Sequence, residues 1–336
     1  MTSAPRVSVL LPAFNAAATL GACLRSLTRQ RETRWECVLV DDGSTDATQS
    51  IAAAAAAADA RVQVVRRPHR GLVAALSAGL PFCRAPYVAR MDADDIMHRD
   101  RLGAQVELLD RHPHLAAVGC HVRLWPRTGL TDGRRAYERW LLSIRDAGAV
   151  RAEAFVECPV AHPTLLVRRD VLRLFGYRNA GWPEDYDLVL RLLAAGHEID
   201  MVPRRLVSWR DHPGRLSRLD PTYSLDRFTA CKAEFLAMGF LQGHARYVLW
   251  GYGSTGKALA RALAEHGKQP SAVVDVHPRR IGQRIGGVPV VPPDALASLR
   301  PPRLVVSVAG PGPRALIRDA LATMGFVEWR DFVCAA

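Results

Sequence analysis

The sequence has no uninterrupted apolar run of the roughly 18 to 20 residues that a bilayer-spanning helix needs. Its first residues, MTSAPRVSVLLPAFN, hold an apolar stretch too short for a secretory signal peptide and lack the flanks of one. These absences argue against a membrane-spanning helix and a leader. We therefore expect a cytoplasmic protein.

Cysteine is sparse and scattered. The seven cysteines are odd in number and none belongs to a C-x-x-C pair, so neither a disulfide framework nor a thiolate zinc site is expected. They stand at positions 23, 37, 83, 120, 158, 231 and 334.

Lysine is nearly absent and occurs only at positions 232, 257 and 268, although the net charge is +12. Arginine therefore supplies almost all of the positive charge, which favours anionic partners such as phosphorylated substrates or an acidic membrane face. Peripheral association with the inner face of a membrane stays open on this basis. Basic stretches such as RRPHR lack interleaved aromatic residues, so no nucleic-acid partner is expected.

Apolar runs and helix-like segments alternate along the chain. VSVLLPA, WECVLVDD, RVQVVRR and PYVARMD have the pattern of strands, and ATLGACLRSLTRQ and GLVAALSAGLPFC that of helices. An alanine run at 52–58 predicts another helix, which Ser44 or Thr45 is expected to cap. The alternation predicts an α/β fold with a mostly parallel central sheet covered on both faces.

Polar turns follow three of the predicted strands, with the sequences PAFN, DDGSTD and DADD. Ligands of parallel α/β sheets bind beyond the carboxyl ends of the strands, so these turns are expected to share one rim. In the last turn Asp92, Asp94 and Asp95 would raise one another's pKa, which is unfavourable until a positive group lies among them. An exposed acidic turn is the alternative interpretation.

Seven segments in order give the sequence a specific resemblance. VSVLLPAFNAAATLGACLRSL, ECVLVDDGSTDAT, RGLVAALSAGL and YVARMDADDIMHRDRL resemble family-2 glycosyltransferases with the GT-A nucleotide-sugar-binding fold. HPTLLVRRDVL, GWPEDYDLVLRLL and WRDHPGRLS extend the similarity over roughly residues 6 to 220. The resemblance implies a nucleotide-sugar donor.

The resemblance identifies Asp92 and Asp94 with the D-x-D motif of the family. It implies that Asp94 contacts a metal ion and that Asp92 lies near both the metal and the donor ribose. Carboxylates suit Mn²⁺ or Mg²⁺, which would neutralise the departing diphosphate. Asp95 is expected to cap the following turn. His212 is a further candidate metal ligand, with a structural role as the alternative.

The resemblance assigns the first loop to the donor site. Pro12, Ala13 and Phe14 match the segment that lines the base pocket, where the family often has tyrosine at position 14. Asn15 either joins this site or holds the turn by bonding its own backbone.

Three further positions complete the predicted donor site. Asp42 matches the aspartate that accepts a hydrogen bond from the base, with a helix cap as the alternative. Arg70 would pair with the diphosphate or lie exposed, and Gly71 would let the backbone approach a phosphate. Ala93, between the two motif aspartates, is placed with Asp92 on the donor side.

Asp185 in WPEDYDLVLRL is the predicted catalytic base. An acceptor hydroxyl must lose its proton as it attacks, and a positioned carboxylate takes it. Glu184 and Asp185 are expected at the positive end of an amphipathic helix, where acids are also stabilised as simple caps. Glu184 is predicted to bind the acceptor. His162 is expected to shape the acceptor side of the cleft.

After about residue 242 a strand, a glycine-rich turn and a helix begin again. Gly251, Gly253 and Gly256 form G-x-G-x-x-G, and Asp275 follows at about the spacing expected for a ribose contact. This region resembles the small Rossmann-like domain of bacterial sugar acyltransferases. A nucleotide-binding role and a purely structural role are both open.

The sequence thus predicts a GT-A domain at 1–241 and a Rossmann-like domain at 242–336. We expect a metal-dependent, inverting transfer of sugar, from a UDP-sugar donor, to a hydroxyl of a glycan or lipid-linked acceptor. The alternative is a sugar-nucleotide-binding regulatory protein, or a nucleotide-dependent oxidoreductase that acts through the C-terminal domain.

Overall fold

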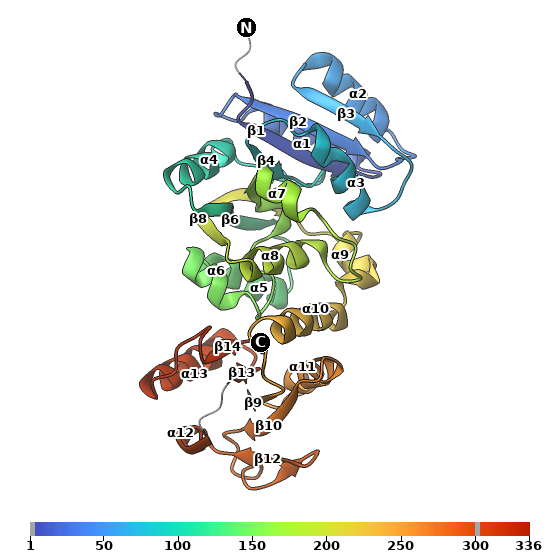
Figure 1. Cartoon of the computed structure of the whole chain (residues 1–336). Coiled ribbons are helices and arrows are strands. Elements are labelled where there is room, and N and C mark those ends of the chain that lie inside the picture. The colour runs from blue at the N-terminus through green and yellow to red at the C-terminus, as the bar shows by residue number, and fades with distance from the viewer. Residues whose placement is uncertain (1–3, 300–302) are drawn as a thin grey trace. The chain divides into compact units, whose positions relative to one another are not determined.

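The computed structural model describes residues 4–299 and 303–336 of the chain (Figure 1). The chain forms two compact units, and each gathers separate stretches of the sequence. The first unit contains the residues up to 150 together with 160–180 and 191–216, and the remainder forms the second. The domain boundary expected between residues 241 and 242 stays a prediction.

The first unit contains one large sheet and the helices that cover it. Its elements are β1 (Val7–Ala13), α1 (Ala17–Thr28), β2 (Trp35–Asp41), α2 (Thr48–Ala58), β3 (Val62–Arg66), α3 (Leu72–Gly79), η1 (Leu80–Phe82), β4 (Tyr87–Arg90), β5 (Ile96–Met97), α4 (Arg101–Arg111), β6 (Leu115–Trp125), α5 (Asp132–Ser143), η2 (His162–Thr164), β7 (Leu166–Arg168), α7 (Arg169–Phe175) and β8 (Glu198–Arg210). Three helices continue from one unit into the other: α6 (Ala147–Glu153), α8 (Glu184–Ala194) and α9 (Leu216–Leu219).

The sheet has the strand order β3-β2-β1-β4-β7-β6-β8-β5. Strands β1 to β4 are parallel, β7 is antiparallel to both of its neighbours, and β8 runs parallel to β6. The predicted mixed α/β fold with a mostly parallel sheet is therefore confirmed.

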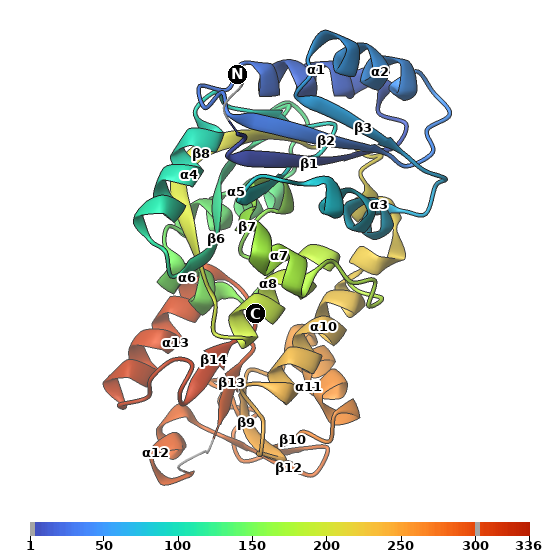
Figure 2. The same ribbon diagram turned by 45° about the horizontal axis from the view of Figure 1, so that its top comes forward.

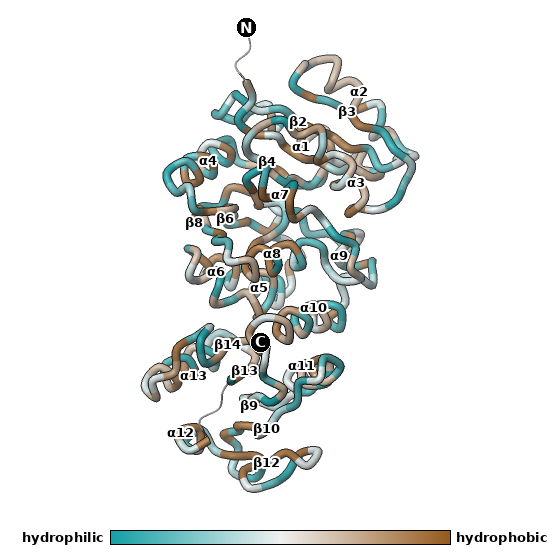
Figure 3. The backbone as a smooth tube through the Cα atoms, viewed as in Figure 1, coloured by the Kyte–Doolittle hydropathy of each residue, from teal (hydrophilic) through white to brown (hydrophobic). Residues whose placement is uncertain are grey.

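Burial on both faces explains the apolar strand sequences of β1 and β2, since every residue of the two strands is buried. Helices α1 and α2 cover one face and α3 covers the other (Figure 2). Gly79 of α3 packs so closely that an added Cβ would lie 2.5 Å from Leu10 and 2.6 Å from Val40. The alanine run of α2 is coloured pale brown in Figure 3, and within this run Ala52 is buried in the core beside the sheet.

Helix α2 begins at Thr48, so the predicted caps Ser44 and Thr45 are wrong. The hydroxyl of Ser44 instead accepts a hydrogen bond from the backbone of Asn15 at 3.0 Å. Asp46 accepts from the backbone N–H of Thr48 at 2.9 Å and closes the turn before the helix. The polar residues between β2 and α2 therefore stabilise the loop that follows β2.

Helix α4 is attached to the end of β4 by the fully buried side chain of Arg101. Its guanidinium donates to the carbonyl of Arg90 at 2.8 Å and to Gln105 Oε1 at 3.1 Å. Gln105 in turn donates to the carbonyl of Thr164 at 2.7 Å. This network fixes the backbone immediately before the acidic turn.

The second unit contains a six-stranded sheet of order β11-β12-β10-β9-β13-β14, parallel except for β11. The first of its parallel strands in sequence, β9, lies between β10 and β13. Its elements are η3 (Pro221–Tyr223), α10 (Leu225–Met238), β9 (Arg246–Trp250), α11 (Ser254–Glu265), β10 (Gln269–Val274), β11 (Arg284–Ile285), β12 (Val288–Val291), η4 (Pro293–Ala295), α12 (Leu296–Leu299), β13 (Leu304–Val306), α13 (Pro311–Thr323) and β14 (Phe332–Cys334).

Within the described residues, no helix combines the length and the apolar character that crossing a membrane requires.

Candidate active site

Asp42, directly after β2, anchors the loop that follows β3. Its carboxylate accepts hydrogen bonds from the backbone N–H groups of Gly71 at 2.8 Å and Arg70 at 3.2 Å, and Arg67 lies 3.1 Å away. Because α2 begins only at Thr48, the alternative that Asp42 caps a helix is wrong. The structure thus shows that Asp42 holds the loop after β3. Its contact with a nucleotide base stays a prediction.

Gly71 has a φ of +84° and immediately precedes α3. Among the described residues, no atom lies within 4 Å of the position that a Cβ would take. The backbone conformation rather than crowding therefore requires glycine here. The side chain of Arg70 is exposed, and its pairing with a diphosphate stays a prediction.

The first loop, after Pro12 and Ala13 at the end of β1, stacks on the loop that Asp42 holds. The ring of Phe14 lies parallel to that of His69, with 3.9 Å between centroids, and Phe14 is still 46% exposed. Asn15 has a φ of +47°, and its side-chain oxygen accepts from the backbone of Thr45 at 2.9 Å. Asn15 thus holds the loop after β2, so the alternative in which it bonds its own backbone is wrong, and its place in the donor site stays a prediction.

Three carboxylates gather directly after β4. Oxygen atoms of Asp92, Asp94 and Asp95 all lie within 4.8 Å of one another. Asp92 forms an ion pair with the buried Arg90. Burial acts to raise the pKa of Asp92, but the charges of Arg90 and Arg215 outweigh it and hold the pKa below its usual value.

Asp95 does not cap the turn after it, and that prediction is wrong. Its Oδ1 accepts a hydrogen bond from the backbone N–H of Arg210 on β8 at 2.7 Å. The residue is 1% exposed, and burial together with the charges of Asp92 and Asp94 raises its pKa. Strand β8 reaches the turn only through tertiary folding, so no local pattern signals this partner.

The segment after β8 completes the acid cluster. His212 places Nε2 3.1 Å from Asp94 Oδ2, which brings together two of the predicted metal ligands. Arg210 donates through Nε to the carbonyl of Asp94 at 2.8 Å. Arg215 donates to the carbonyl of Arg210 at 2.7 Å, and its charge acts on Asp92.

Sequence reasoning missed Arg90 and Arg215 as parts of this site. Arg90 is the last residue of β4 and is only 3% exposed, so its charge needs a partner. An arginine that ends an otherwise apolar strand just before the acidic turn was the available signal. Arg215 lies three residues beyond His212 in the matched segment WRDHPGRLS, and only the fold shows its proximity to Asp92.

The donor set fits a hard divalent cation. Three carboxylates crowd together, one of them with a raised pKa, and an imidazole nitrogen contacts a second. Oxygen-rich sets of this kind suit Mg²⁺ or Mn²⁺. An ion held by Asp92 and Asp94 would also offset the repulsion that the cluster otherwise carries.

Helix α8 opens with three acidic residues, in agreement with the expected amphipathic helix. Glu184 is 3% exposed and accepts a hydrogen bond from the hydroxyl of Tyr223 at 2.6 Å. Asp187 accepts from the indole of Trp182 at 3.1 Å. Asp185 is the most accessible of the three. The roles of Asp185 as base and Glu184 as acceptor ligand stay predictions.

His162 lies in η2 of the first unit, where its Nε2 is 3.3 Å from the hydroxyl of Tyr177. Its proximity is one of the smaller contributions to the lowered pKa of Asp92. The expectation that His162 shapes the acceptor side stays a prediction.

The glycine motif of the second unit forms the turn between β9 and α11. Gly251 has a φ of +93°, and a Cβ at Gly256 would lie 2.2 Å from the carbonyl oxygen of Gly251. Gly253 is the residue before α11 and provides no side-chain cap. Asp275 follows β10, accepts from the backbone of His277 and forms an ion pair with Arg280 at 2.9 Å.

A buried hydroxyl lies against this turn. Ser307 follows β13 and donates its backbone N–H to the carbonyl of Trp250 at 2.8 Å. Its Oγ is buried, and within residues 4–299 and 303–336 it has no hydrogen-bond partner. The turn, Asp275 and Ser307 all follow the carboxyl ends of neighbouring parallel strands.

The sequence model of the family described as "Glycosyl transferase family 2" matches residues 8–175. The chain is 31% identical over 242 residues to the putative glycosyltransferase EpsE of Bacillus subtilis, covering 69% of this chain and 84% of EpsE. It is 31% identical over 207 residues to the amylovoran biosynthesis glycosyltransferase AmsE of Erwinia amylovora, covering 60% and 75% of the two chains.

Two solved structures share the fold. S. aureus TarS 1-349 in complex with UDP-GlcNAc aligns with a TM-score of 0.57 and 17% identity over 78% of this chain and 72% of its own. The mannosyltransferase PcManGT from Pyrobaculum calidifontis, in complex with GDP-Man and Mn²⁺, aligns with a TM-score of 0.51 and 19% identity over 98% and 83% of the two chains.

Proposed function

The chain belongs to glycosyl transferase family 2 and is a glycosyltransferase, and on this premise we propose the reaction that its acid cluster serves. It transfers a sugar from a nucleotide-sugar donor, a UDP-sugar, to an acceptor hydroxyl with the help of Mn²⁺ or Mg²⁺. Because the chain belongs to this family, we no longer propose that its main role is that of a regulatory binding protein or an oxidoreductase.

The observation that carries the metal dependence is the contact of His212 with Asp94 inside the three-carboxylate cluster. Asp92, Asp94 and His212 would hold the ion. When bound, a divalent cation supplies Lewis-acid neutralisation of the charge on the leaving nucleoside diphosphate. Arg90 and Arg215 keep Asp92 ionised and so ready to serve as a ligand.

The transfer is a single displacement with inversion. The acceptor oxygen forms a bond to the anomeric carbon while the bond from that carbon to the diphosphate oxygen breaks, and the electron pair leaves with the diphosphate. Asp185 accepts the proton that the acceptor hydroxyl loses. Its place in the first turn of α8 stabilises the ionised form that a base needs.

The similarity to AmsE, an amylovoran biosynthesis glycosyltransferase, supports an acceptor in polysaccharide assembly, as a glycan or a lipid-linked glycan. An acceptor of the lipid-linked kind would bring the enzyme to a membrane surface. We therefore retain peripheral association with the membrane as part of the proposal.

Release of free nucleoside diphosphate from UDP- and GDP-sugars tests the reaction, first with Mn²⁺ and then after chelation with EDTA. We expect release from a UDP-sugar that stops on chelation. Asp185→Asn should abolish transfer to acceptor, while Asp132→Asn, an exposed acid at the start of α5, serves as the matched control. Near-normal transfer by Asp185→Asn would remove the base assignment.

We also propose that the second unit binds a nucleotide or sugar nucleotide between β9 and β13. Ligands of parallel sheets bind where the strand order reverses, and here that point carries the glycine turn and the unpartnered Ser307 hydroxyl. The uncapped start of α11 offers backbone N–H groups to a phosphate.

Binding stoichiometry of the full chain tests this second site. With UDP-sugars or NAD, we expect one nucleotide beyond the one at the acid cluster, and Asp275→Asn should remove the additional one. Asp319→Asn, an exposed acid of α13, is the control. A stoichiometry of one for every nucleotide would leave the second unit with a structural role.

A further inference from the structure

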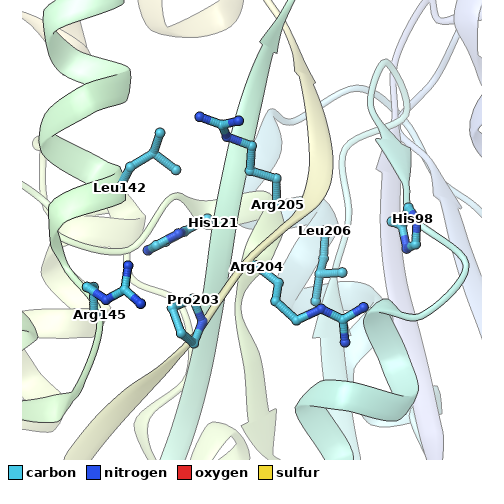
Figure 4. Close-up of a pocket in the computed structure, with 8 residues that line it drawn as sticks. All are labelled: His98, His121, Leu142, Arg145, Pro203, Arg204, Arg205 and Leu206. Carbon is cyan, nitrogen blue, oxygen red and sulfur yellow. The ribbon is translucent and has the colours of Figure 1, made fainter.

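An open pocket of about 480 Å³ lies on the first unit beside β6 and β8 (Figure 4). It is lined by His98 after β5, His121 on β6, Arg145 after α5, and Arg204 and Arg205 on β8, together with apolar side chains. We call it the arginine pocket. It shares no residue with the predicted donor site.

The arginine pocket concentrates positive charge. Of the described residues that line it, none is acidic. Arg204 forms an ion pair with Asp100 at 2.8 Å, and Asp100 also pairs with Arg31. Across the described parts of the chain, Arg145 and Arg205 form no ion pair, so their charges are not offset by the protein.

His121 lines the arginine pocket together with Arg145 and Arg205. It is 4% exposed, and its Nε2 donates to the carbonyl of Ile144 at 2.8 Å. Burial, together with the charges of Arg145 and Arg205, lowers the pKa of this imidazole.

The basic surface continues into a neighbouring pocket of about 300 Å³, which Arg205 also lines. Arg123 and Arg127 extend the positive charge there. The one acid in this pocket, Glu138, is occupied, because it pairs with Arg127 at 2.5 Å and accepts from the backbone of Leu124 at 2.8 Å. The positive charge is therefore spread over the surface that the two pockets share and is not confined to one side chain.

We propose that the arginine pocket binds a phosphate-bearing group at a site separate from the donor. Planar guanidinium groups match phosphate oxygens in pairs, and a phosphate group offers more acceptor oxygen atoms than a carboxylate does. The pocket volume lies within the range of ligand sites. The phosphate comes either from a soluble phosphorylated ligand or from a lipid headgroup.

The test compares the full-length protein with Arg145→Ala/Arg205→Ala, using sodium pyrophosphate as the probe in calorimetry. EDTA in the buffer prevents metal-mediated binding at the acid cluster, so the result does not depend on the proposed transfer reaction. Arg29→Ala/Arg139→Ala removes the same charge from exposed positions outside the pocket and is the matched control. Circular dichroism confirms that each variant is folded.

We expect the pocket variant to bind pyrophosphate about tenfold more weakly or worse, since two charge-assisted contacts are lost. The control should bind within about twofold of the parent, because Arg29 and Arg139 are not among the residues that line either basic pocket. Equal binding by the pocket variant and the control, or no binding of pyrophosphate or anionic vesicles by the parent protein, would overturn the proposal.

Sedimentation with vesicles distinguishes the two sources of phosphate. If phosphatidylglycerol vesicles retain the parent and the control but not the pocket variant, and phosphatidylcholine vesicles retain none, the ligand is a headgroup. If only pyrophosphate binding depends on the pocket arginines, the ligand is a soluble phosphate compound. In both cases the site itself is supported.

Discussion

At the scale of single residues, Asp94 is the carboxylate that links the acid cluster to the segment after β8. Its Oδ2 lies 3.1 Å from His212, and its carbonyl accepts from Arg210. We expect Asp94→Asn to lower nucleoside diphosphate release about a hundredfold and His212→Ala about tenfold, because loss of a ligand weakens metal binding. Titration with Mn²⁺ should show a raised requirement in both variants, and His114→Ala, an exposed histidine, should behave as the parent. Unchanged metal dependence in Asp94→Asn would contradict the assignment.

Asp42 gives a second test at this scale, because its two interpretations differ in the absence of substrate. A carboxylate that only contacts a nucleotide base has little effect on the free protein. The observed bonds to the backbone of Arg70 and Gly71 predict that Asp42→Asn lowers the free energy of unfolding by about 1 to 3 kcal/mol, the cost of losing partners for buried donors. Urea unfolding without nucleotide measures it, with Asp132→Asn as control. An unchanged midpoint would leave base recognition as the main role of Asp42.

At the scale of elements, α10 carries a buried lysine whose charge depends on pH. Burial lowers the pKa of Lys232 to about 8, and its Nζ donates to the carbonyls of Val156 and Ala335 at 3.0 and 2.7 Å. The unfolded chain holds this proton up to about pH 10.4. Between these values the unfolded state binds the extra proton, so the contribution of Lys232 to stability rises with pH.

Substitution isolates this contribution. Relative to Lys232→Met, the parent protein should gain stability from pH 8 to pH 10, as measured by urea unfolding at each pH. Below pH 8 the difference between the two proteins should be constant. Lys257→Met, an exposed lysine of α11, is the control and should show no such trend. A parallel pH dependence of the parent and Lys232→Met would contradict the prediction.

The strands whose residues are all buried could be predicted well from the sequence. β1 occupies the predicted segment VSVLLPA, and β2 and β3 end within a residue or two of their predicted limits, because strands buried on both faces read as unbroken apolar runs. The start of α2 and the role of Asp95 could not be predicted. Ser44 contacts Asn15 and Asp95 contacts Arg210, and only the fold brings these partners close. The acid cluster could be predicted from the sequence, but the roles of Arg90 and Arg215 in balancing its charge could not.

At the scale of the whole molecule, the second unit is discontinuous in sequence. Residues 151–159 belong to it, and Glu153 forms ion pairs with Arg314 at 3.0 Å and Arg318 at 2.7 Å. Arg314 is 4% exposed, and Val156 packs against the core of the parallel sheet. A sequence pattern that restarts near residue 242 cannot reveal these contacts, since they join segments more than 150 residues apart.

The discontinuity predicts how fragments behave. A fragment of residues 242–336 leaves the buried Arg314 without Glu153, and an uncompensated buried charge costs about 3 to 5 kcal/mol, comparable to the stability of a small domain. We therefore expect the fragment to lack a cooperative thermal transition, and Glu153→Gln in the full chain to destabilise the second unit by a similar amount. Glu265→Gln, an exposed acid of α11, is the control. A fragment that unfolds cooperatively at the temperature of the full chain would show that residues 242–336 form an independent domain, as the sequence pattern predicts.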